Sequence, residues 1–321
     1  MKLVSLFMDV EDPVNPQADD AALDFALLFS ELGVRGSFCL TGEKCRTLVA
    51  RNRNDVLDAF SGHCLGLHTD THSIHPTTME LLEDLDYSSG CTAALAAETK
   101  GATAFEQALG RTPSFWGGAG NTWAPEIPQA LVNLGIPAYC YALTELPGKP
   151  VHRFNSCFAL PQHISVSEEA VVRAPDVLES TLGQIAGIDQ PWVGVFVGHP
   201  TRHRYPRFWD RDYAGGANPT SLTAMPPIPN RQYEKAKDAV RGLIRGIVGK
   251  HKVVGVDELL AKPMRLDEPS RDDINYFRVA TVANLRGAAS WPIHRSKLNP
   301  QNIISKTLAL SETLEVCVLA V

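Results

Sequence analysis

The sequence lacks the features that mark membrane, secreted or nucleic-acid-binding proteins. No stretch approaches the roughly 20 apolar residues that a membrane-spanning helix needs, and the apolar run after Met1 ends at Asp9, which is too short for a signal peptide. Basic residues form no long run, and the formal net charge is −6, so a surface for binding phosphates is not indicated. We therefore expect a soluble, cytoplasmic protein with neither a membrane nor a nucleic-acid partner.

Paired cysteines are absent as well. The seven cysteines are scattered, odd in number and without any CxxC spacing. This pattern argues against both a disulfide framework and a zinc site made of thiolates. We expect most of these cysteines to be small buried hydrophobic residues.

What is present is the composition and patterning of a large α/β protein. The chain has 321 residues, of which 44% are hydrophobic and 21% charged, as is typical of a folded globular chain. Apolar runs alternate with amphipathic segments from a strand at residues 3–10 and a helix at 21–32 to a last strand at 252–256. Such alternation predicts parallel strands in an α/β barrel or a doubly wound sheet. A polar loop at 199–229 is long enough to indicate a functional role.

Ionisable residues follow three of the predicted strands. Asp9, Glu11 and Asp12 end the first strand. His68 and His72 follow the third, and His199 follows a later one. Parallel α/β folds place their active sites at these strand ends. Two imidazoles and a carboxylate leave a coordination position open for water, as in catalytic zinc sites. We expect a divalent metal, zinc first, with cobalt, nickel or manganese as alternatives.

Three motifs resemble those of the polysaccharide deacetylase, or NodB-homology, family of carbohydrate esterases (carbohydrate esterase family 4). Residues 6–12 resemble the acidic motif that ends the family's first strand, residues 33–42 its second strand, and residues 62–72 its HTxxH motif. The resemblance extends from about residue 3 to about residue 262. It implies a distorted (β/α) barrel over 1–262, followed by a small C-terminal extension, 263–321, whose architecture the pattern does not define.

The resemblance also implies an activity, which is the metal-dependent removal of an acyl group, usually acetyl, from an amide nitrogen. The substrate would be an N-acetylated sugar or a related soluble compound. Carried over by position, Asp9 is the base, Glu11 the carboxylate ligand, His68 and His72 the imidazole ligands, and His199 the acid. Because carboxylates flank Glu11 on both sides, Asp12 is the alternative ligand. His203 lies four residues after His199 and is the alternative acid.

The chain departs from the family at its third motif, where an arginine that orients the base is replaced by Trp116-Gly117-Gly118. We predict that Trp116, Gly117, Gly118 and Trp123 bind substrate, because glycines permit close backbone approach and aromatic rings can stack on sugars. The alternative is a tight strand-to-helix turn. The histidine motif also ends in Ser73 instead of proline.

Two other functions stay open. The missing arginine suggests a catalytically silent barrel that binds carbohydrate or a protein partner. The acidic residues and histidines at the strand ends argue against this alternative. The second alternative function is that of a metallohydrolase with a similar barrel that cleaves a cyclic amide. The sequence defines neither the substrate nor the oligomeric state, so a homo-oligomer is open too.

Overall fold

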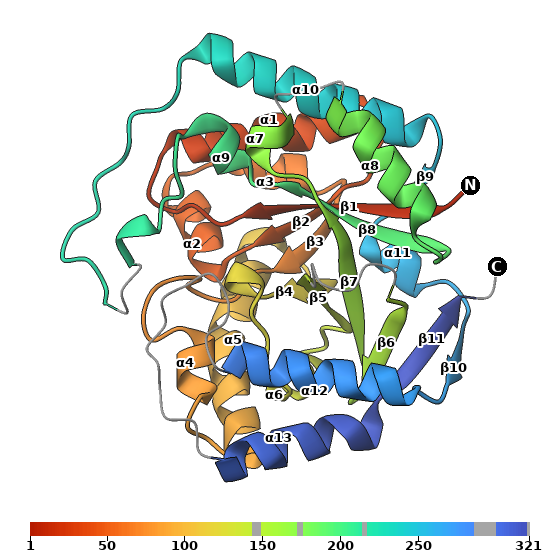
Figure 1. Ribbon diagram of the computed structural model, residues 1–321. Helices are drawn as coiled ribbons and strands as arrows, with labels where there is room; N and C mark the ends of the chain where they lie inside the picture. The colour runs from red at the N-terminus through yellow and green to blue at the C-terminus, as the bar shows by residue number, and fades with distance from the viewer. Residues whose placement is uncertain (143–148, 172–175, 214–216, 286–299, 320–321) are drawn as a thin grey trace.

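Seven parallel strands close into a barrel in the computed structural model, which describes residues 1–142, 149–171, 176–213, 217–285 and 300–319 (Figure 1). Around the barrel the strands follow the order β1, β2, β3, β4, β5, β7 and β8, and β8 pairs with β1 to close the ring. Their bounds are Leu3–Val10, Ser37–Leu40, Cys64–Leu67, Phe115–Gly117, Ala138–Ala142, Cys157–Ser165 and Trp192–Gly198. The predicted barrel is confirmed, and the doubly wound sheet is not formed.

Helices surround the barrel, as expected for parallel strands joined by crossover connections. Figure 1 shows α1, α8 and α10 along one side and α5, α6, α12 and α13 along the other. The helices α1 to α13 span Gln17–Glu31, Gly42–Ala50, Asn54–Phe60, Thr78–Leu82, Tyr87–Leu109, Glu126–Asn133, Glu168–Val171, Asp176–Gly187, Pro200–Arg204, Asn230–Val248, Val256–Leu260, Arg271–Leu285 and Pro300–Thr313.

Local signals explain where these helices begin and end. The α2 helix begins after Thr41, whose Oγ1 accepts a hydrogen bond from the backbone N–H of Lys44. The α5 helix ends at Gly110, whose φ of 68° lies in the left-handed region. The loop predicted at 199–229 differs in one respect, because it contains α9 and a short 3-10 helix, Arg211–Tyr213. Pro200 occupies the first turn of α9, a position that suits proline.

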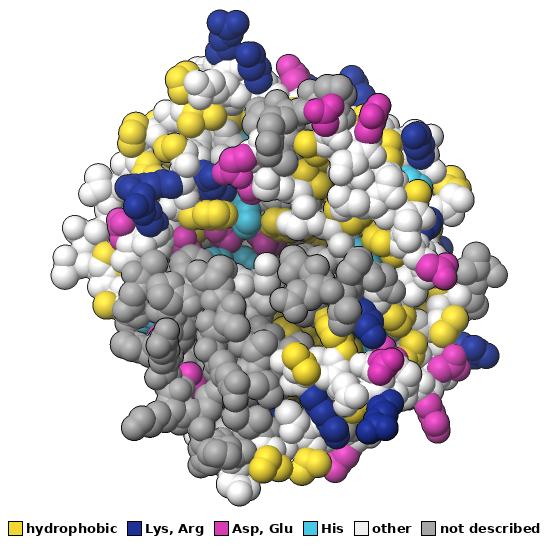
Figure 2. Space-filling view, in the orientation of Figure 1, with side chains coloured by type: hydrophobic (Ala, Val, Ile, Leu, Met, Phe, Trp, Pro, Cys, Tyr) yellow, Lys and Arg dark blue, Asp and Glu magenta, His cyan; other side chains and the backbone are white. Residues whose placement is uncertain are grey.

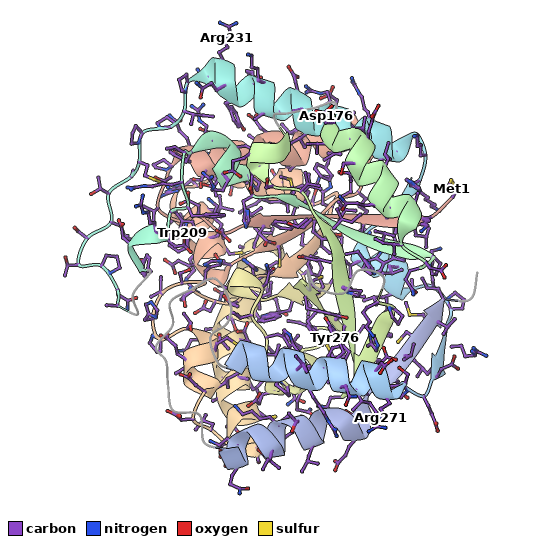
Figure 3. All side chains as sticks on the ribbon, viewed as in Figure 1. Met1, Asp176, Trp209, Arg231, Arg271 and Tyr276 are labelled. Atoms are coloured by element: carbon purple, nitrogen blue, oxygen red, sulfur yellow. The ribbon has the colours of Figure 1, made fainter. Side chains whose placement is uncertain are left out.

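The core has two layers, one inside the barrel and one between the barrel and the helices. Phe7, Phe115 and Trp192 belong to the inner cluster, and side chains fill the space within the barrel in Figure 3. Strand β1 is buried along most of its length, which accounts for its continuous apolar run. Six of the seven cysteines are buried and Cys91 is half-buried, which confirms the expectation for most of them.

The segment after Pro263 packs onto the barrel. Strands β10 (Met264–Asp267) and β11 (Glu315–Leu319) continue the sheet through β6 (Val151–Phe154), which pairs with β7, and all three pairings are antiparallel. In α12, the ring of Phe277 is buried against Trp123 and Phe154. In α13, Lys306 forms a buried ion pair with Glu126 of α6, with 2.7 Å between Nζ and Oε1.

No helix in the described ranges is both long and apolar enough to cross a membrane.

Candidate metal centre

Three strand ends of the barrel bring the predicted chemical groups together. Asp9 lies in β1 and Glu11 just beyond it, His68 and His72 follow β3, and His199 follows β8. The carboxyl ends of parallel strands share one rim of a barrel, so residues far apart in the sequence become neighbours there. Figure 2 shows acidic and histidine side chains gathered in a hollow near the centre of this face.

Glu11 is the centre of this group. Its side chain is 2% exposed, and Oε2 lies 2.9 Å from Nε2 of His72 and 3.3 Å from Nε2 of His68. Within the described ranges, Oε2 accepts no hydrogen bond of acceptable geometry. The three residues offer ligand atoms that all lie within 4.8 Å of one another. A cation bound among these atoms would be held by all three side chains and would compensate the buried charge of Glu11.

The outer ring nitrogens define how these imidazoles are protonated. Nδ1 of His68 lies 2.9 Å from the carbonyl oxygen of Gly117, which only accepts, so Nδ1 donates. In the neutral ring Nε2 then carries a lone pair that faces Glu11. Burial favours neutral His72, but the charges of Glu11 and Asp210 outweigh burial and raise the pKa of His72 to about 10. The surroundings of His72 therefore favour a positive charge at this ring, beside Glu11.

Asp9 and His199 lie on the open side of this cluster. Nε2 of His199 is 3.9 Å from Oδ2 of Asp9 and 3.9 Å from Oε2 of Glu11. Burial raises the pKa of Asp9 above its ordinary value, which makes its carboxylate a stronger base. Burial alone would lower the pKa of His199, but nearby carboxylates, first among them Glu11, raise it to about 9. The imidazole of His199 is thus protonated at neutral pH.

Glu168, which sequence reasoning missed, orients His199. Its Oε1 accepts hydrogen bonds from Nδ1 and from the backbone N–H of His199, both at 2.7 Å. Gly198 permits this approach, because its φ is 110° and a Cβ there would lie 2.8 Å from Oε1. The signal in the sequence was the acidic pair Glu168-Glu169 after a strand of the same barrel, which stands at the same rim.

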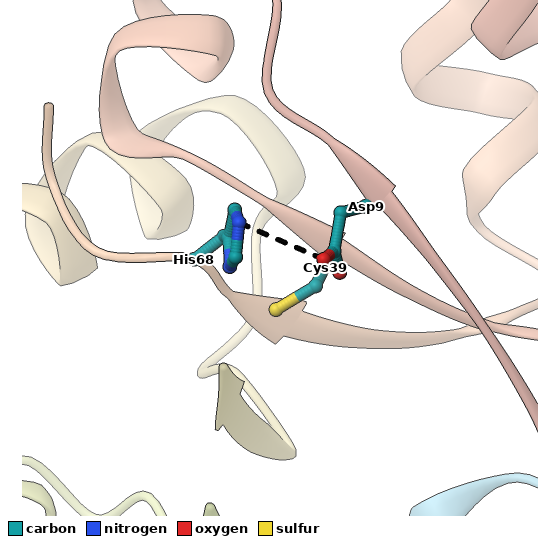
Figure 4. Close-up of side chains that lie close together, drawn as sticks. All are labelled: Asp9, Cys39 and His68. Atoms are coloured by element: carbon teal, nitrogen blue, oxygen red, sulfur yellow. Dashed lines mark ion pairs between the residues drawn. The ribbon is translucent and has the colours of Figure 1, made fainter. Parts of the chain in front are cut away.

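Cys39 was also missed. Its sulfur lies within 4.8 Å of ligand atoms of Asp9 and His68, which form an ion pair at 3.7 Å. Figure 4 shows the three side chains together, with this ion pair dashed. Burial raises the pKa of the Cys39 thiol well above its ordinary value. The thiol is therefore neutral beside the carboxylate of Asp9.

The two alternative residues lie outside the cluster. The oxygens of Asp12 accept bonds from the backbone N–H groups of Val14 and Asn15, both at 2.9 Å, from Nδ2 of Asn15 at 2.8 Å and from Oγ1 of Thr201 at 2.5 Å. Asp12 thus stabilises the turn before α1. His203 is buried, with its ring centroid 5.0 Å from that of Phe25, and burial lowers its pKa to about 4.

The residues predicted to bind substrate are placed differently from the prediction. Trp116 and Trp123 are at most 1% exposed, so neither presents a face to a sugar. The Nε1–H of Trp116 donates to Oε2 of Glu98 at 2.7 Å. Gly118 forms the tight turn named as the alternative, since a Cβ there would lie 1.7 Å from a backbone oxygen. Gly117 supports His68 through its carbonyl oxygen.

A small cavity of about 30 Å³ adjoins His72. Its lining includes Thr69, Met79, Ala119 and Thr122. A water molecule needs about 10–15 Å³ by the same measure, so the cavity has room for one or two water molecules or for a group of similar size.

No family model and no curated protein matches the chain. Solved structures do. A 4-alpha-glucanotransferase from Thermococcus litoralis aligns over 82% of this chain and 40% of its own, with 12% identity and a TM-score of 0.55. A protein from Mycobacterium smegmatis that is assigned to the polysaccharide deacetylases aligns over 80% of this chain and 88% of its own, with 12% identity and a TM-score of 0.50.

A further solved structure is the Xyl-CE4 domain of a multidomain xylanase from the hindgut metagenome of Trinervitermes trinervoides. It aligns over 81% of this chain and 89% of its own, with 15% identity and a TM-score of 0.45. At these identities the likeness concerns the fold. The chain has the (β/α) barrel fold of the polysaccharide deacetylases, as the sequence motifs led us to expect.

Proposed function

We propose that the protein is a metal-dependent hydrolase that removes an acetyl group from an amide nitrogen of an N-acetylated sugar or a related compound. The observation that carries this proposal is the convergence of three buried ligand atoms, since Oε2 of Glu11 lies 3.3 Å from Nε2 of His68 and 2.9 Å from Nε2 of His72. One carboxylate and two imidazoles suit zinc, and also cobalt, nickel or manganese.

The other residues supply the proton transfers. A divalent metal, when bound, lowers the pKa of its water to roughly 7 and polarises the amide carbonyl. Asp9, with its raised pKa, accepts the proton of the attacking water. His199 is protonated because its pKa is about 9, and it donates a proton to the departing nitrogen, since an amine is a poor leaving group as an anion. Glu168 holds the imidazole of His199 in place for this step.

Two observations support the substrate class. The cavity beside His72 is small, about 30 Å³, and includes Met79 and Ala119 in its lining, which suits a short acyl group better than a long acyl chain. The barrel is also shared with a protein assigned to the polysaccharide deacetylases, and this likeness supports a carbohydrate as the compound that carries the acyl group.

The second candidate is a silent barrel that binds carbohydrate or a protein partner. One observation favours it: among the described residues, no lysine or arginine forms an ion pair with Asp9, and only His68 and His199 do so. The arginine of the family thus has no cationic substitute other than these imidazoles. A hydrolase of cyclic amides would use the same ligands, and substrate specificity separates it from the deacetylase.

One experiment distinguishes the candidates. The protein is stripped of metal, reloaded separately with zinc, cobalt, nickel or manganese, and assayed for bound metal and for acetate release from N-acetylated sugars and their oligomers. Acetylated and cyclic amides serve as comparison substrates. We expect one bound metal and acetate release, and we expect Asp9→Asn to keep the metal and lose the activity. One bound metal without any turnover would support the silent barrel, and failure to bind metal would overturn the metallohydrolase.

A further inference from the structure

The two imidazoles of the candidate metal centre are supported differently. Nδ1 of His68 donates to a neutral backbone carbonyl, that of Gly117. Nδ1 of His72 instead lies 2.6 Å from Oγ of Ser73 and 3.3 Å from Oδ2 of Asp210. A charged group therefore supports only the second ring of the pair.

Ser73 links His72 to Asp210. Oγ of Ser73 lies 2.5 Å from Oδ2 of Asp210, and both residues are buried. A carboxylate only accepts hydrogen bonds, so the Ser73 hydroxyl donates to Asp210. Its lone pairs are then free to accept from Nδ1–H of His72. In the neutral ring, the form that binds a metal, this chain of donors and acceptors leaves Nε2 of His72 without a proton on the side of Glu11.

The hydrogen bonds that connect Asp210 to His72 through Ser73 account for its burial better than a structural role does. Its side chain is 1% exposed, and within the described ranges Oδ1 has no hydrogen-bond partner. Burying a carboxylate with one oxygen unsatisfied destabilises a fold, so a role in structure alone does not explain the residue.

Other contacts hold the segment that carries Asp210. Trp209, labelled in Figure 3, precedes Asp210, and its ring centroid is 5.8 Å from that of His72. The backbone oxygen of Tyr213 accepts from Nε2 of His75 at 3.0 Å. The side chain of Asn218 exchanges two hydrogen bonds with the backbone of His75, both at 2.7 Å. Replacing the carboxylate of Asp210 therefore leaves the segment anchored to the loop after β3.

We propose that Asp210 is a positioning residue that acts through the hydroxyl of Ser73 to hold His72 with Nδ1 protonated and Nε2 directed at the metal. The inference rests on the proposed metal site. Hydrogen bonds to the outer nitrogen of a ligating imidazole fix its tautomer and make it a stronger ligand, and their loss typically reduces metal affinity about 10- to 100-fold.

The test measures metal affinity and not turnover. Zinc or cobalt binding to the full-length protein is followed by competition with a chelator, and the visible spectrum of the cobalt form reports the ligand geometry. We expect Asp210→Asn to weaken binding about 10- to 100-fold and to alter the cobalt spectrum. Ser73→Ala should weaken binding less, because Oδ2 of Asp210 stays 3.3 Å from Nδ1. Ser73→Thr keeps the hydroxyl and should restore binding.

Asp212→Asn is the matched control, because it removes an exposed carboxylate two residues away, and its affinity should equal that of the wild type. If Asp210→Asn and Ser73→Ala both bind metal as the wild type does, the inference is overturned. If Asp210→Asn fails to fold, Ser73→Ala and Ser73→Thr decide the question. If the wild type binds metal but releases no acetate, the proposed deacetylase function is refuted. The metal affinities of the variants would still test the role of Asp210.

Discussion

The two halves of the barrel rim differ sharply in what their strand ends carry. At the ends of β1, β3 and β8, buried carboxylates and imidazoles face one another within 4 Å. After β4 and along β5, buried aromatic rings pack on one another instead, with Trp123 against Tyr139 and against Phe277 of the C-terminal segment. Among the described residues, the carboxylates and imidazoles of the candidate metal centre thus lie at the ends of β1, β3 and β8, whereas β4 and β5 contribute packing.

Gly117 connects the two halves. It belongs to β4, yet its carbonyl oxygen is the acceptor for Nδ1 of His68, and a Cβ at this position would lie 3.3 Å from that nitrogen. The strand that lacks the arginine of the resembling family therefore contributes to the candidate metal centre through its backbone. Predictions that separate the two halves follow, beginning with the largest expected effect.

Glu11→Gln should abolish metal binding and activity at the ends of β1, β3 and β8. An amide is a weak metal ligand, so bound metal should fall below one per chain after reloading, and acetate release should drop by a factor of about a thousand or more. Metal analysis and acetate assays on the same preparation measure both effects. The matched control is Asp12→Asn. The asparagine oxygen can accept the two backbone bonds of the turn, whereas its amide replaces the oxygen that accepts from Asn15 and Thr201, so this variant should lose stability and keep the metal. Metal loss in this control, and not in Glu11→Gln, would identify Asp12 as the ligand.

Lys306→Met should destabilise the packing of α13 on α6 and leave metal binding unchanged. It leaves Glu126 buried without its ion-pair partner, which typically costs about 3–5 kcal/mol in the free energy of unfolding. Denaturant unfolding measures the loss, and metal content per folded molecule should be unchanged. Adding Glu126→Leu should recover most of the stability. A single variant as stable as the wild type would show that α13 contributes little to the fold.

Glu98 lies between the halves, since it accepts from Trp116 of β4 and from Thr78 at the start of α4. Burial raises the pKa of Glu98 to about 7 from an ordinary value of 4.5. The folded state therefore holds this proton more tightly than the unfolded state does, and the associated stability is lost as the pH rises from about 4.5 to about 7, by up to about 3 kcal/mol.

Glu98→Gln should remove this loss. Unfolding measured at pH 5 and at pH 8 should show a smaller decrease in the variant than in the wild type. An equal decrease in both proteins would show that Glu98 is not the group responsible.

Glu168→Gln should give the smallest effect, a shift in a pH profile. The carboxylate stabilises the charged imidazole of His199, so its removal lowers the pKa of His199. The acid is active when protonated, and activity is therefore lost at a lower pH on the alkaline side. The pH dependence of kcat/KM measures this shift. An alkaline limb that stays where it is in the wild type would exclude His199 as the group that titrates there.

The sequence predicted the polar half of the site better than the apolar half. His68, His72 and Glu11 follow strands whose apolar runs are unambiguous, and a barrel brings such ends together by its geometry. Trp123 was misjudged because it is buried against Phe277, which is distant in the sequence, and Trp116 because it is buried with its Nε1–H bonded to Glu98 of a helix. Asp210 and Glu168 could not be paired with their histidines from spacing, since loops and a helix position them. The choice between Glu11 and Asp12 as the ligand depends on hydrogen bonds, because backbone N–H groups bind the carboxylate of Asp12 whereas that of Glu11 faces the histidines. The sequence contains no pattern that predicts these bonds.

The central claim is that Glu11, His68 and His72 hold one divalent metal. Anomalous X-ray diffraction from a crystal of the zinc-loaded protein, collected at the zinc absorption edge, tests it most directly. We predict a single peak at about 2.0–2.2 Å from Oε2 of Glu11 and from Nε2 of both histidines. A peak coordinated by Asp12, or no peak among these residues in the zinc-loaded protein, would contradict the account.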